Sequence, residues 1–362
     1  MREALLISKP IAPPWTDSNK NLVRDLARAF TRTRARVMVP RGSSFEGAIS
    51  EPIYDAAGAY APSRVANARV LARLVTGPRA DVWHFFFSPN PLTLRAGRIA
   101  ARVRRVPTVH TLASAPDTLE AVAPMLFADR VVVLSRHTEK RLAAVGVQAE
   151  VIPPCVTVPA RDAAAVQRAR ERYNLPARYV LYPGDLEHSD GAATFVRAAA
   201  RARSGDVGWV VAARPKTPAA HAARERLMAD AKARDAEITW LGEIDDILAV
   251  VAGAAAVTLV VDTLHAKMDW PLVLLEALRY GVPVVVSEGS AAAELSDSGG
   301  ARVVRAGDDE ALAEACAALT GDEAAARAMG ERGGRWVSEM CSPEAVAAAY
   351  ERVYDTVCAR RA

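Results

Sequence analysis

The stretch LLEALRYGVPVVVS, residues 274–287, joins the end of an apolar helix to the start of a buried strand. Gly281 suits the left-handed conformation that commonly closes a helix, and Pro283 prevents the helix from continuing. The run Val282–Val286 is apolar throughout, as in strands that are buried on both faces of a parallel sheet. A helix that passes directly into such a strand is typical of α/β architecture.

The same alternation of strands and helices extends along the chain in both directions. Helical periodicity separates a series of short apolar runs, which we expect to be strands. In the first half these are Ala4–Ser8, Arg36–Val39, Asp81–Phe87, Thr108–Leu112, Val131–Leu134 and Val151–Ile152. In the second half they are Tyr179–Tyr182, Trp209–Ala212, Ile238–Leu241, Ala256–Val261 and Val282–Val286. Residues 41–63 are expected to form a surface loop, and Ser18 or Asn19 to cap a helix over Leu22–Thr31.

The length of 362 residues is sufficient for two α/β cores. We therefore predict an α/β fold of two Rossmann-like, doubly wound domains facing a central cleft, where the carboxyl ends of the strands bind ligands. The first domain is expected to span residues 1–157 and the second residues 158–344. A last helix, residues 345–362, is expected to cross back to the first domain.

Charge is unevenly distributed between the two halves. Residues 1–154 hold 22 Lys and Arg against 12 Asp and Glu, a balance of +10, which leaves 24 against 30, or −6, for the rest. The chain lacks a nucleic-acid-reading motif, so we expect no nucleic-acid partner. Solvated helix faces, an anionic membrane surface and a phosphorylated acceptor all remain compatible with the basic half. The basic helices that would reach a membrane carry Arg24, Arg28, Arg32 and the arginines of residues 95–105.

The segments Leu274–Leu278 and Gly281–Ser287 resemble the LLEAMA-x-G-x-PVVAS segment of retaining glycosyltransferases of family GT4. Four shorter segments are also similar to motifs of that family: Tyr182-Pro183-Gly184, Trp240-Leu241-Gly242, Ala128–Ser135 and Val151-Ile152-Pro153. The resemblance extends from about Asp81 to the C-terminus. It implies the GT-B fold, with a nucleotide-sugar donor on the second domain and the acceptor on the first.

The resemblance gives Glu276 the task of holding the nucleotide ribose. A carboxylate can accept two hydroxyl hydrogen bonds, and a helix beginning near Pro271 would place Glu276 in about its first turn, where the helix dipole favours an anion. Ser287-Glu288-Gly289-Ser290 follows the buried strand and would offer backbone amides to a diphosphate at the next helix start. A purely structural role for Glu276 at the helix terminus is the alternative. The implied donor site includes Gly184, Ser287, Gly289 and Ser290.

The donor loop departs from the family pattern G-R-L-x-x-x-K-G. Asp185 stands where the family has Arg, and Asp190 where it has Lys. Met268 replaces the first Glu of the family's E-x7-E motif. We consider Lys267 as a substitute cation and Asp269 as either a sugar ligand or a helix cap, with Arg214 and Lys216 as second choices that solvated loop charges would also explain.

Three further features concern the acceptor side. His110, at the expected carboxyl end of the strand Thr108–Leu112, stands where GT4 enzymes often keep a histidine near the reacting sugar, although a structural role is an equal alternative. His84 is expected in the core or at a strand end. The residues Trp15, Thr16, Asp17 and Ser18 follow the first strand and are expected to contact the acceptor, with Trp15 stacking on a sugar or simply packing.

These features predict a glycosyltransferase that moves a sugar from a nucleotide-sugar to an unknown hydroxylated acceptor, with retention of configuration as the resemblance implies. No metal-ligand spacing is present and the four cysteines lie far apart, so we expect no metal, no cofactor and reduced thiols. The expected location is the cytoplasm, peripheral to the inner face of the membrane. A catalytically altered GT-B homologue that binds a glycan, a nucleotide or a partner protein is the main alternative, and a sugar-nucleotide epimerase is less favoured.

Overall fold

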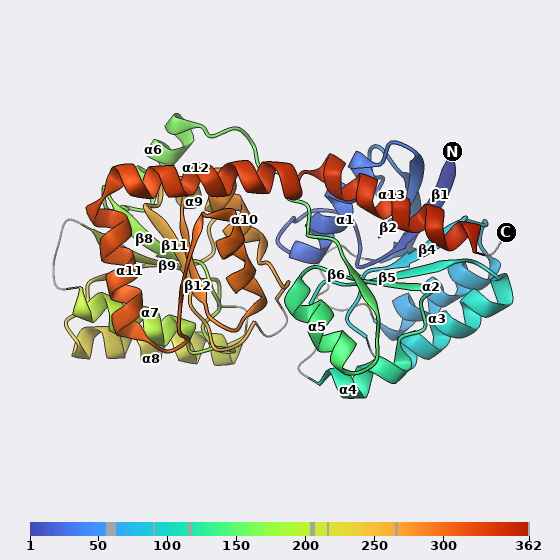
Figure 1. Cartoon of the computed structure of the whole chain (residues 1–362), viewed down its shortest axis with the longest axis horizontal. Helices are drawn as coiled ribbons and strands as arrows, with labels where there is room; N and C mark the ends of the chain where they lie inside the picture. The colour runs from blue at the N-terminus through green and yellow to red at the C-terminus, as the bar shows by residue number, and fades with distance from the viewer. Residues whose placement is uncertain are drawn as a thin grey trace. The chain divides into compact units, whose positions relative to one another are not determined.

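The computed structural model describes residues 1–55, 63–89, 91–114, 118–202, 207–215, 217–264 and 267–360. The chain divides into two compact units, which Figure 1 colours along the sequence. Unit 1 consists of Met1–Thr157, Ala266–Asp269 and Met340–Ala362, and unit 2 of Val158–His265 and Trp270–Glu339. Lys216 lies outside the described residues.

Unit 1 contains a seven-stranded parallel sheet in the order β3-β2-β1-β4-β5-β6-β7. Its strands are β1 (Arg2–Ile7), β2 (Thr33–Pro40), β3 (Ile49–Tyr54), β4 (Val82–Phe85), β5 (Thr108–Leu112), β6 (Arg130–Val133) and β7 (Ala149–Val151). Its helices are α1 (Ser18–Ala29), α2 (Arg64–Thr76), α3 (Pro91–Arg104), α4 (Leu119–Val122), η1 (Ala123–Met125), α5 (Arg136–Ala144) and α13 (Pro343–Ala359).

Unit 2 contains a six-stranded parallel sheet in the order β10-β9-β8-β11-β12-β13. Its strands are β8 (Tyr179–Tyr182), β9 (Gly208–Ala212), β10 (Ile238–Leu241), β11 (Ala256–Leu259), β12 (Val284–Ser287) and β13 (Ala301–Val304). Its helices are α6 (Ala163–Arg172), α7 (Gly191–Arg201), α8 (Pro218–Ala233), α9 (Ile247–Gly253), α10 (Leu272–Arg279), η2 (Ala291–Ser298), α11 (Asp309–Gly321) and α12 (Glu323–Met340).

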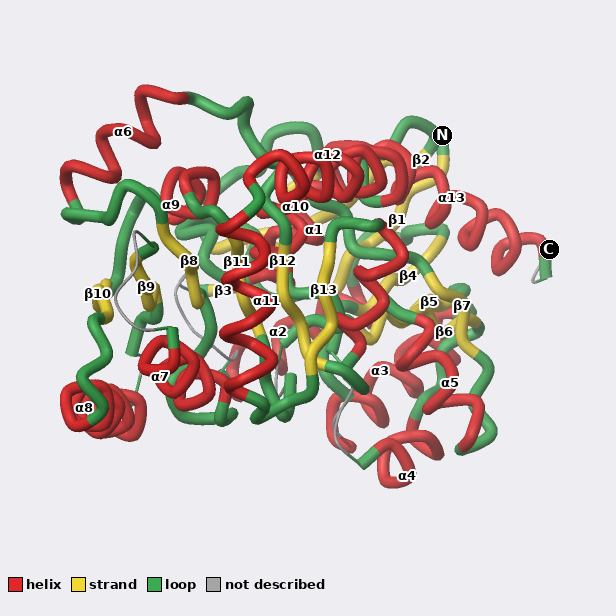
Figure 2. Tube along the Cα trace, turned by 60° about the vertical axis from the view of Figure 1, so that its left-hand side comes forward, coloured by secondary structure: helices red, strands yellow, loops and turns green. Residues whose placement is uncertain are grey.

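Both sheets therefore contain the strand order 3-2-1-4-5-6 of a doubly wound Rossmann domain, as predicted. Figure 2 traces the strands of both in yellow. The order reverses between β1 and β4 in unit 1 and between β8 and β11 in unit 2. The loops that follow these strands at their carboxyl ends are the places where such sheets bind ligands.

Two edge strands were not predicted. β3 occupies part of the expected 41–63 loop, and its Pro52 and Glu51 give it a sequence unlike a buried strand. Proline is tolerated there because β3 is at the edge of its sheet. β13, at the edge of the other sheet, has two exposed residues among its four and so lacks a continuous apolar pattern.

The helix α13 packs onto unit 1 through a buried polar network. The ring of His84 on β4 contacts the Tyr354 hydroxyl at 2.7 Å through Nδ1 and the Thr111 hydroxyl at 2.7 Å through Nε2. Tyr350 contacts the same Thr111 hydroxyl at 3.0 Å. His84 has no exposed surface, and burial holds its pKa well below the ordinary value. The prediction that His84 is a core residue is confirmed.

The turn after α10 contains Gly281 in a left-handed conformation and lies against a second glycine, Gly330. Gly281 has φ +74°, its N–H donates to the Leu278 carbonyl at 2.9 Å, and the Val282 N–H donates to the Ala277 carbonyl at 2.9 Å. This is the left-handed cap that the sequence predicted. α12 passes so close that a Cβ at Gly330 would lie 1.8 Å from the Gly281 carbonyl oxygen.

All four cysteines are unpaired, and three of them are buried. Among the helices of the described residues, none is both long and apolar enough to span a membrane.

Candidate functional site

The loop between β8 and α7 lies at the carboxyl end of the first strand of unit 2. Gly184 is buried there, and a Cβ at this position would lie 2.2 Å from the Tyr182 ring. The Tyr182 hydroxyl donates to the Asp185 carbonyl oxygen at 3.0 Å, and the His188 N–H donates to Asp185 Oδ1 at 2.9 Å. The Asp185 side chain therefore shapes this loop by holding its own backbone.

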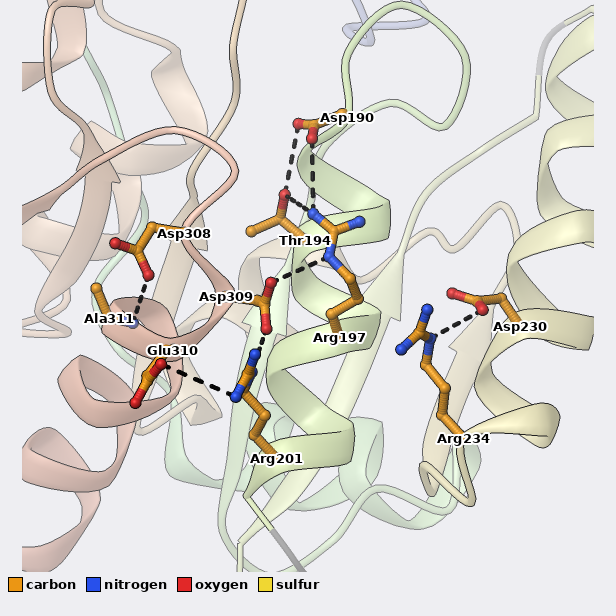
Figure 3. Close-up of polar contacts among 10 residues, drawn as sticks. All are labelled: Asp190, Thr194, Arg197, Arg201, Asp230, Arg234, Asp308, Asp309, Glu310 and Ala311. Atoms are coloured by element: carbon orange, nitrogen blue, oxygen red, sulfur yellow. Dashed lines mark hydrogen bonds and ion pairs between the residues drawn. The ribbon is translucent and has the colours of Figure 1, made fainter.

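Asp190 stands immediately before α7 and makes contacts in two directions. Its N–H donates to Asp262 Oδ1 at 2.9 Å, which ties the loop after β8 to the loop after β11. Its carboxylate lies 3.7 Å from Arg197 Nη2 and accepts a hydrogen bond from the Thr194 hydroxyl at 3.4 Å (Figure 3). Arg197, two turns along the same helix, thus balances the charge that stands where the family has Lys.

Arg197 was not singled out from the sequence. Asp190 directly precedes α7 and Arg197 lies seven residues further on, a spacing of about two helical turns that puts both on one side, and this was the available signal. Figure 3 shows that Arg197 also reaches the first residue of α11, with Nε 3.1 Å from Asp309 Oδ1. Burial acts to raise the pKa of Asp309, but hydrogen bonds from Arg201 and Arg197 lower it. These pairs fasten α7 to α11.

The position of Glu276 differs from the prediction. α10 begins at Leu272, so Glu276 is its fifth residue, and the first turn contains no acidic residue. The helix dipole therefore cannot be the reason for a glutamate here, because its effect is confined to the terminal turn. Glu276 is half-buried, and burial together with the Glu276 charge raises the pKa of Tyr280.

The segment after β12 forms a tight turn into η2. The Ser287 side chain is buried, and its hydroxyl accepts from the Val261 N–H and donates to the Val261 carbonyl, both at 2.6 Å. The Ser290 hydroxyl donates to the Ser287 carbonyl at 2.8 Å. Gly289 has φ +72°, a conformation that favours glycine. The side chain of Ser287 is thus committed to joining β12 to the loop after β11, which leaves backbone amides as the donors at this turn.

Asp269 does not cap α10. The residue preceding that helix is Pro271, which makes no side-chain capping bond. Asp269 belongs to unit 1, where its Oδ2 accepts from the Ser135 hydroxyl at 2.7 Å and its N–H contacts the Ala113 carbonyl at 3.3 Å. Lys267 is half-buried and Met268 is buried.

Trp270 follows this segment and is buried. Trp270 packs against Trp336 with ring centroids 5.4 Å apart, and its Nε1 has no hydrogen-bond partner among the described residues. Arg214, a second choice for a phosphate contact, pairs with Glu243 at 2.5 Å, which fits its interpretation as a loop charge.

His110 is the third of the five residues of β5, so it does not stand at the strand's end as predicted. Its ring has no exposed surface, and Nε2 donates to the Phe87 carbonyl at 2.9 Å, while Nδ1 has no partner in the described part of the chain. Burial lowers the pKa of His110 to about 4, although the Phe87 contact acts to raise it. The imidazole is therefore neutral at physiological pH.

The segment Trp15–Ser18 lies after β1, the corresponding place in unit 1. Asp17 caps α1 by accepting from the Asn19 and Lys20 N–H groups at 2.9 and 3.2 Å, so the prediction of Ser18 or Asn19 as the cap is wrong. Burial acts to raise the pKa of Asp17, but its 2.6 Å contact with Lys9 lowers it. Thr16 is exposed and Ser18 is half-buried as the first residue of the helix.

Cations surround the half-buried Trp15. The Lys20 ammonium lies 5.7 Å and the Arg24 guanidinium 5.0 Å from its ring centroid. Lys20 is 5% exposed, and its ammonium donates to the Pro14 carbonyl at 3.2 Å. Burial lowers the pKa of Lys20. This end of unit 1 therefore places an aromatic face, which could stack on a sugar, beside cations whose charge Asp17 and Asp25 partly balance.

Among the described residues, no group of three or more His, Cys, Asp and Glu side chains could hold a metal ion.

Two family models match the chain in separate segments. Residues 20–158 match the model described as Glycosyltransferase Family 4, and residues 177–322 match the model described as Glycosyl transferases group 1. None of the curated protein sequences is a match.

Several solved structures share the fold over the whole chain. HepE of Anabaena, solved in complex with UDP and glucose, has a TM-score of 0.77 at 17% identity and covers 98% of this chain and 100% of its own. Sucrose-phosphate synthase of Thermosynechococcus elongatus has a TM-score of 0.75 at 21% identity, with 99% and 100% covered. The α,α-trehalose-phosphate synthase (UDP-forming) of Burkholderia vietnamiensis has a TM-score of 0.73 at 16% identity, with 99% and 98% covered.

Proposed function

Because the chain is a GT-B glycosyltransferase made of a family 4 domain and a group 1 domain, we propose that it transfers a sugar from a nucleotide-sugar, UDP-linked in the first instance, to a hydroxylated acceptor. One observation carries the proposal. The segments that resemble the donor motifs, after β8 and β12, lie at the carboxyl end of one parallel sheet. UDP is chosen because HepE is solved with UDP and with UDP-glucose, and the trehalose-phosphate synthase is UDP-forming.

The proposed donor contacts within unit 2 lie on α10 and on the loops after β8 and β12. Glu276 is half-buried and keeps a carboxylate that can accept both ribose hydroxyls. The amides of Gly289 and Ser290 take the diphosphate, since the Ser287 hydroxyl is already bonded to Val261. Gly184 and Asp185 are proposed to line the donor site from the loop after β8. Lys267 is retained as the proposed substitute cation, and Asp269 as a proposed sugar ligand that would have to exchange its Ser135 contact.

The acceptor is proposed to bind unit 1 along Trp15–Ser18. Trp15 supplies a stacking face, Thr16 and Ser18 supply hydroxyl groups, and Asp17 keeps the segment in place as the cap of α1. We assign no proton transfer to His110, because the ring is buried and is already a donor to Phe87. His110 instead serves as a positioning residue for the loop after β4.

Retention of the anomeric configuration, which the family resemblance implies, is part of the proposal. Retaining transfer needs no paired carboxylate base if the departing phosphate oxygen takes the acceptor's proton. NMR of the product would identify the anomer, and an inverted product would remove this part of the proposal while leaving sugar transfer in place. No resident metal or cofactor is assigned.

The proposed location is the cytoplasmic side of an anionic membrane. The surplus of ten positive charges in residues 1–154 is the support for this location. Arg24 of α1 and Arg32, which follows α1, contribute little to it, because Arg24 pairs with Asp25 and Arg32 pairs with Glu351 and Asp355.

Calorimetric titration with UDP, GDP, ADP and their glucose conjugates tests the donor site. We expect one nucleotide to bind, and Glu276→Gln to weaken it by about tenfold or more, the effect of losing a charge-assisted hydrogen bond. Glu225→Gln, a change of the same kind on an exposed residue of α8, is the matched control. Equal affinities for wild type and Glu276→Gln, or binding of none of the nucleotides, would contradict the proposed donor site.

A further inference from the structure

Helices α2 and α3 of unit 1 expose an unusual combination of side chains. Of the ten large apolar side chains exposed in the described part of the chain, six lie on these two helices. They are Val65, Leu71, Val75, Leu92, Ile99 and Val103. The two helices pack against each other, so these side chains belong to neighbouring elements. Such a concentration distinguishes this surface from the scattered apolar residues that every soluble protein exposes.

On α3 the apolar side chains form one strip. Leu92, Ile99 and Val103 are 77%, 64% and 68% exposed, and their spacing of seven and four residues puts them within one narrow sector of the helix. The opposite side of the helix supplies Leu94, Gly97 and Ala101 to the interior. The strip is therefore a second apolar face, in addition to the one that α3 needs for folding.

Arginines line one side of this strip. Arg95, Arg98 and Arg102 are exposed, and their spacing of three and four residues puts them on one face of the helix beside the strip. Neither α2 nor α3 contains an acidic residue. Within the described residues no ion pair is formed by these three arginines, whereas Arg69 and Arg73 of α2 pair with Asp55 and Glu51.

We propose that this face, defined as the exposed side of α3 with the adjoining side of α2, docks unit 1 onto an anionic lipid bilayer. The strip of Leu92, Ile99 and Val103 enters the boundary between headgroups and acyl chains, and Arg95, Arg98 and Arg102 contact lipid phosphates while their methylene stems cover apolar surface. Charge complementarity favours this occupant, because exposed arginines on two helices that carry no acidic residue match the phosphates of anionic lipids. The inference rests on the proposed membrane location and deepens it, since a bilayer-docked transferase takes acceptors carried on lipids.

Vesicle co-sedimentation of the full chain tests the docking face. We expect binding to vesicles of equimolar phosphatidylglycerol and phosphatidylcholine, none to phosphatidylcholine alone, and weaker binding at high salt. Replacing Arg95, Arg98 and Arg102 together by Gln should reduce the partition coefficient by about a hundredfold. The matched control replaces three exposed arginines of other helices, Arg226, Arg335 and Arg352, by Gln and should retain binding.

A second set of variants separates apolar insertion from simple charge attraction. Leu92→Gln, Ile99→Gln and Val103→Gln, combined, should lower binding by tenfold or more. The same change at the exposed residues Met228, Val303 and Met340 should leave it intact. All these side chains are exposed, so thermal unfolding should be unchanged and confirms that each variant folds.

Three outcomes would overturn the docking proposal. The first is equal vesicle binding by the α3 variants and their controls. The second is no binding by the wild type to either vesicle. The third is self-association of the wild type that is lost in the α3 variants, with no vesicle binding by the wild type. That result would make the face an interface between copies. The nucleotide titration is made without vesicles, so failure of the donor site is distinguishable from failure of this face.

Discussion

The two units share a strand order but differ in the loop that follows their first strand. After β1, Lys9 and the buried Lys20 accompany a carboxylate that caps a helix. After β8, the corresponding loop carries Asp185 and Asp190, and the balancing cation, Arg197, lies two turns into the helix. The strand order thus determines where a ligand loop lies but does not determine its charge.

The difference has a consequence for phosphate recognition in unit 2. A diphosphate that approaches α7 meets the Asp190 carboxylate, which is not a capping group, instead of a cation. Within unit 2, backbone amides after β12 must then supply the attraction, and we expect nucleotide affinity to depend on Glu276 and the ribose more than on phosphate charge.

The largest expected effect comes from a substitution that adds one methyl group at the start of α7, next to the unit 2 loop. Gly191→Ala places a Cβ 2.5 Å from Val261 Cγ1 and 2.8 Å from the Val260 carbonyl oxygen, so the free energy of unfolding should fall by about 3 kcal/mol. At the matching first residue of α1, Ser18→Ala should change it by less than about 0.5 kcal/mol. Urea unfolding of both variants is the measurement, and a neutral Gly191→Ala would show that the loop has room to move.

Acid should destabilise unit 1 before unit 2. His84 and His110 are buried with lowered pKa values, so the unfolded state binds more protons, and their contribution is complete above the unfolded pKa of about 6.5 and is lost as the pH falls toward the folded value. For His110, with a pKa of about 4, the loss between pH 7 and 5 is about 2 kcal/mol. The lowered pKa of Asp309 in unit 2 matters only below about pH 4.

Hydrogen exchange at pH 7 and pH 5 measures this difference. Amides of β4 and β5 should lose protection, corrected for intrinsic exchange, while those of β8 and β11 keep it. Equal losses in both sheets would refute the assignment of the acid sensitivity to the buried histidines.

The two aspartates that precede the matching helices should also differ. Asp17→Ala removes two capping hydrogen bonds and the Lys9 contact, so the free energy of unfolding should drop by about 1–2 kcal/mol. Asp190→Ala removes a partly exposed ion pair and no cap, so the loss should stay below about 0.5 kcal/mol. If both losses were equal, the difference in capping would have no energetic meaning.

The smallest expected effect concerns the charge of the unit 2 loop. Asp190→Asn should tighten UDP binding by about threefold at low salt and less at high salt, because one repulsive charge near the proposed phosphate position is removed. Glu225→Gln on α8 is again the control in calorimetry. Weaker binding by Asp190→Asn would mean that this carboxylate assists the nucleotide.

The predictions from the sequence were best where a pattern was long and local. The strands β5, β8 and β10 and the helix cap at Gly281 were predicted with their observed residues or geometry. The edge strands β3 and β13 were not, because an edge strand needs only one apolar side or none. Among the candidate site residues, Gly184 and Gly289 lie on loops after strands, whereas Glu276 lies within α10 and His110 within β5.

By itself the sequence determined the α/β fold class and the family resemblance, because apolar periodicity and short motifs are local properties. The order of the strands in each sheet came from the structure. The tertiary structure alone decided that Asp17 caps α1, that Ser287 is bonded to Val261 and that Arg197 faces Asp190. It also showed His110 in mid-strand without exposed surface. The Ser287–Val261 pair depends on groups far apart in the chain, which meet only once the sheet has assembled and water has been excluded. The Asp17 cap and the Arg197–Asp190 pair are local, but the sequence offered Ser18 and Asn19 as competing caps for α1.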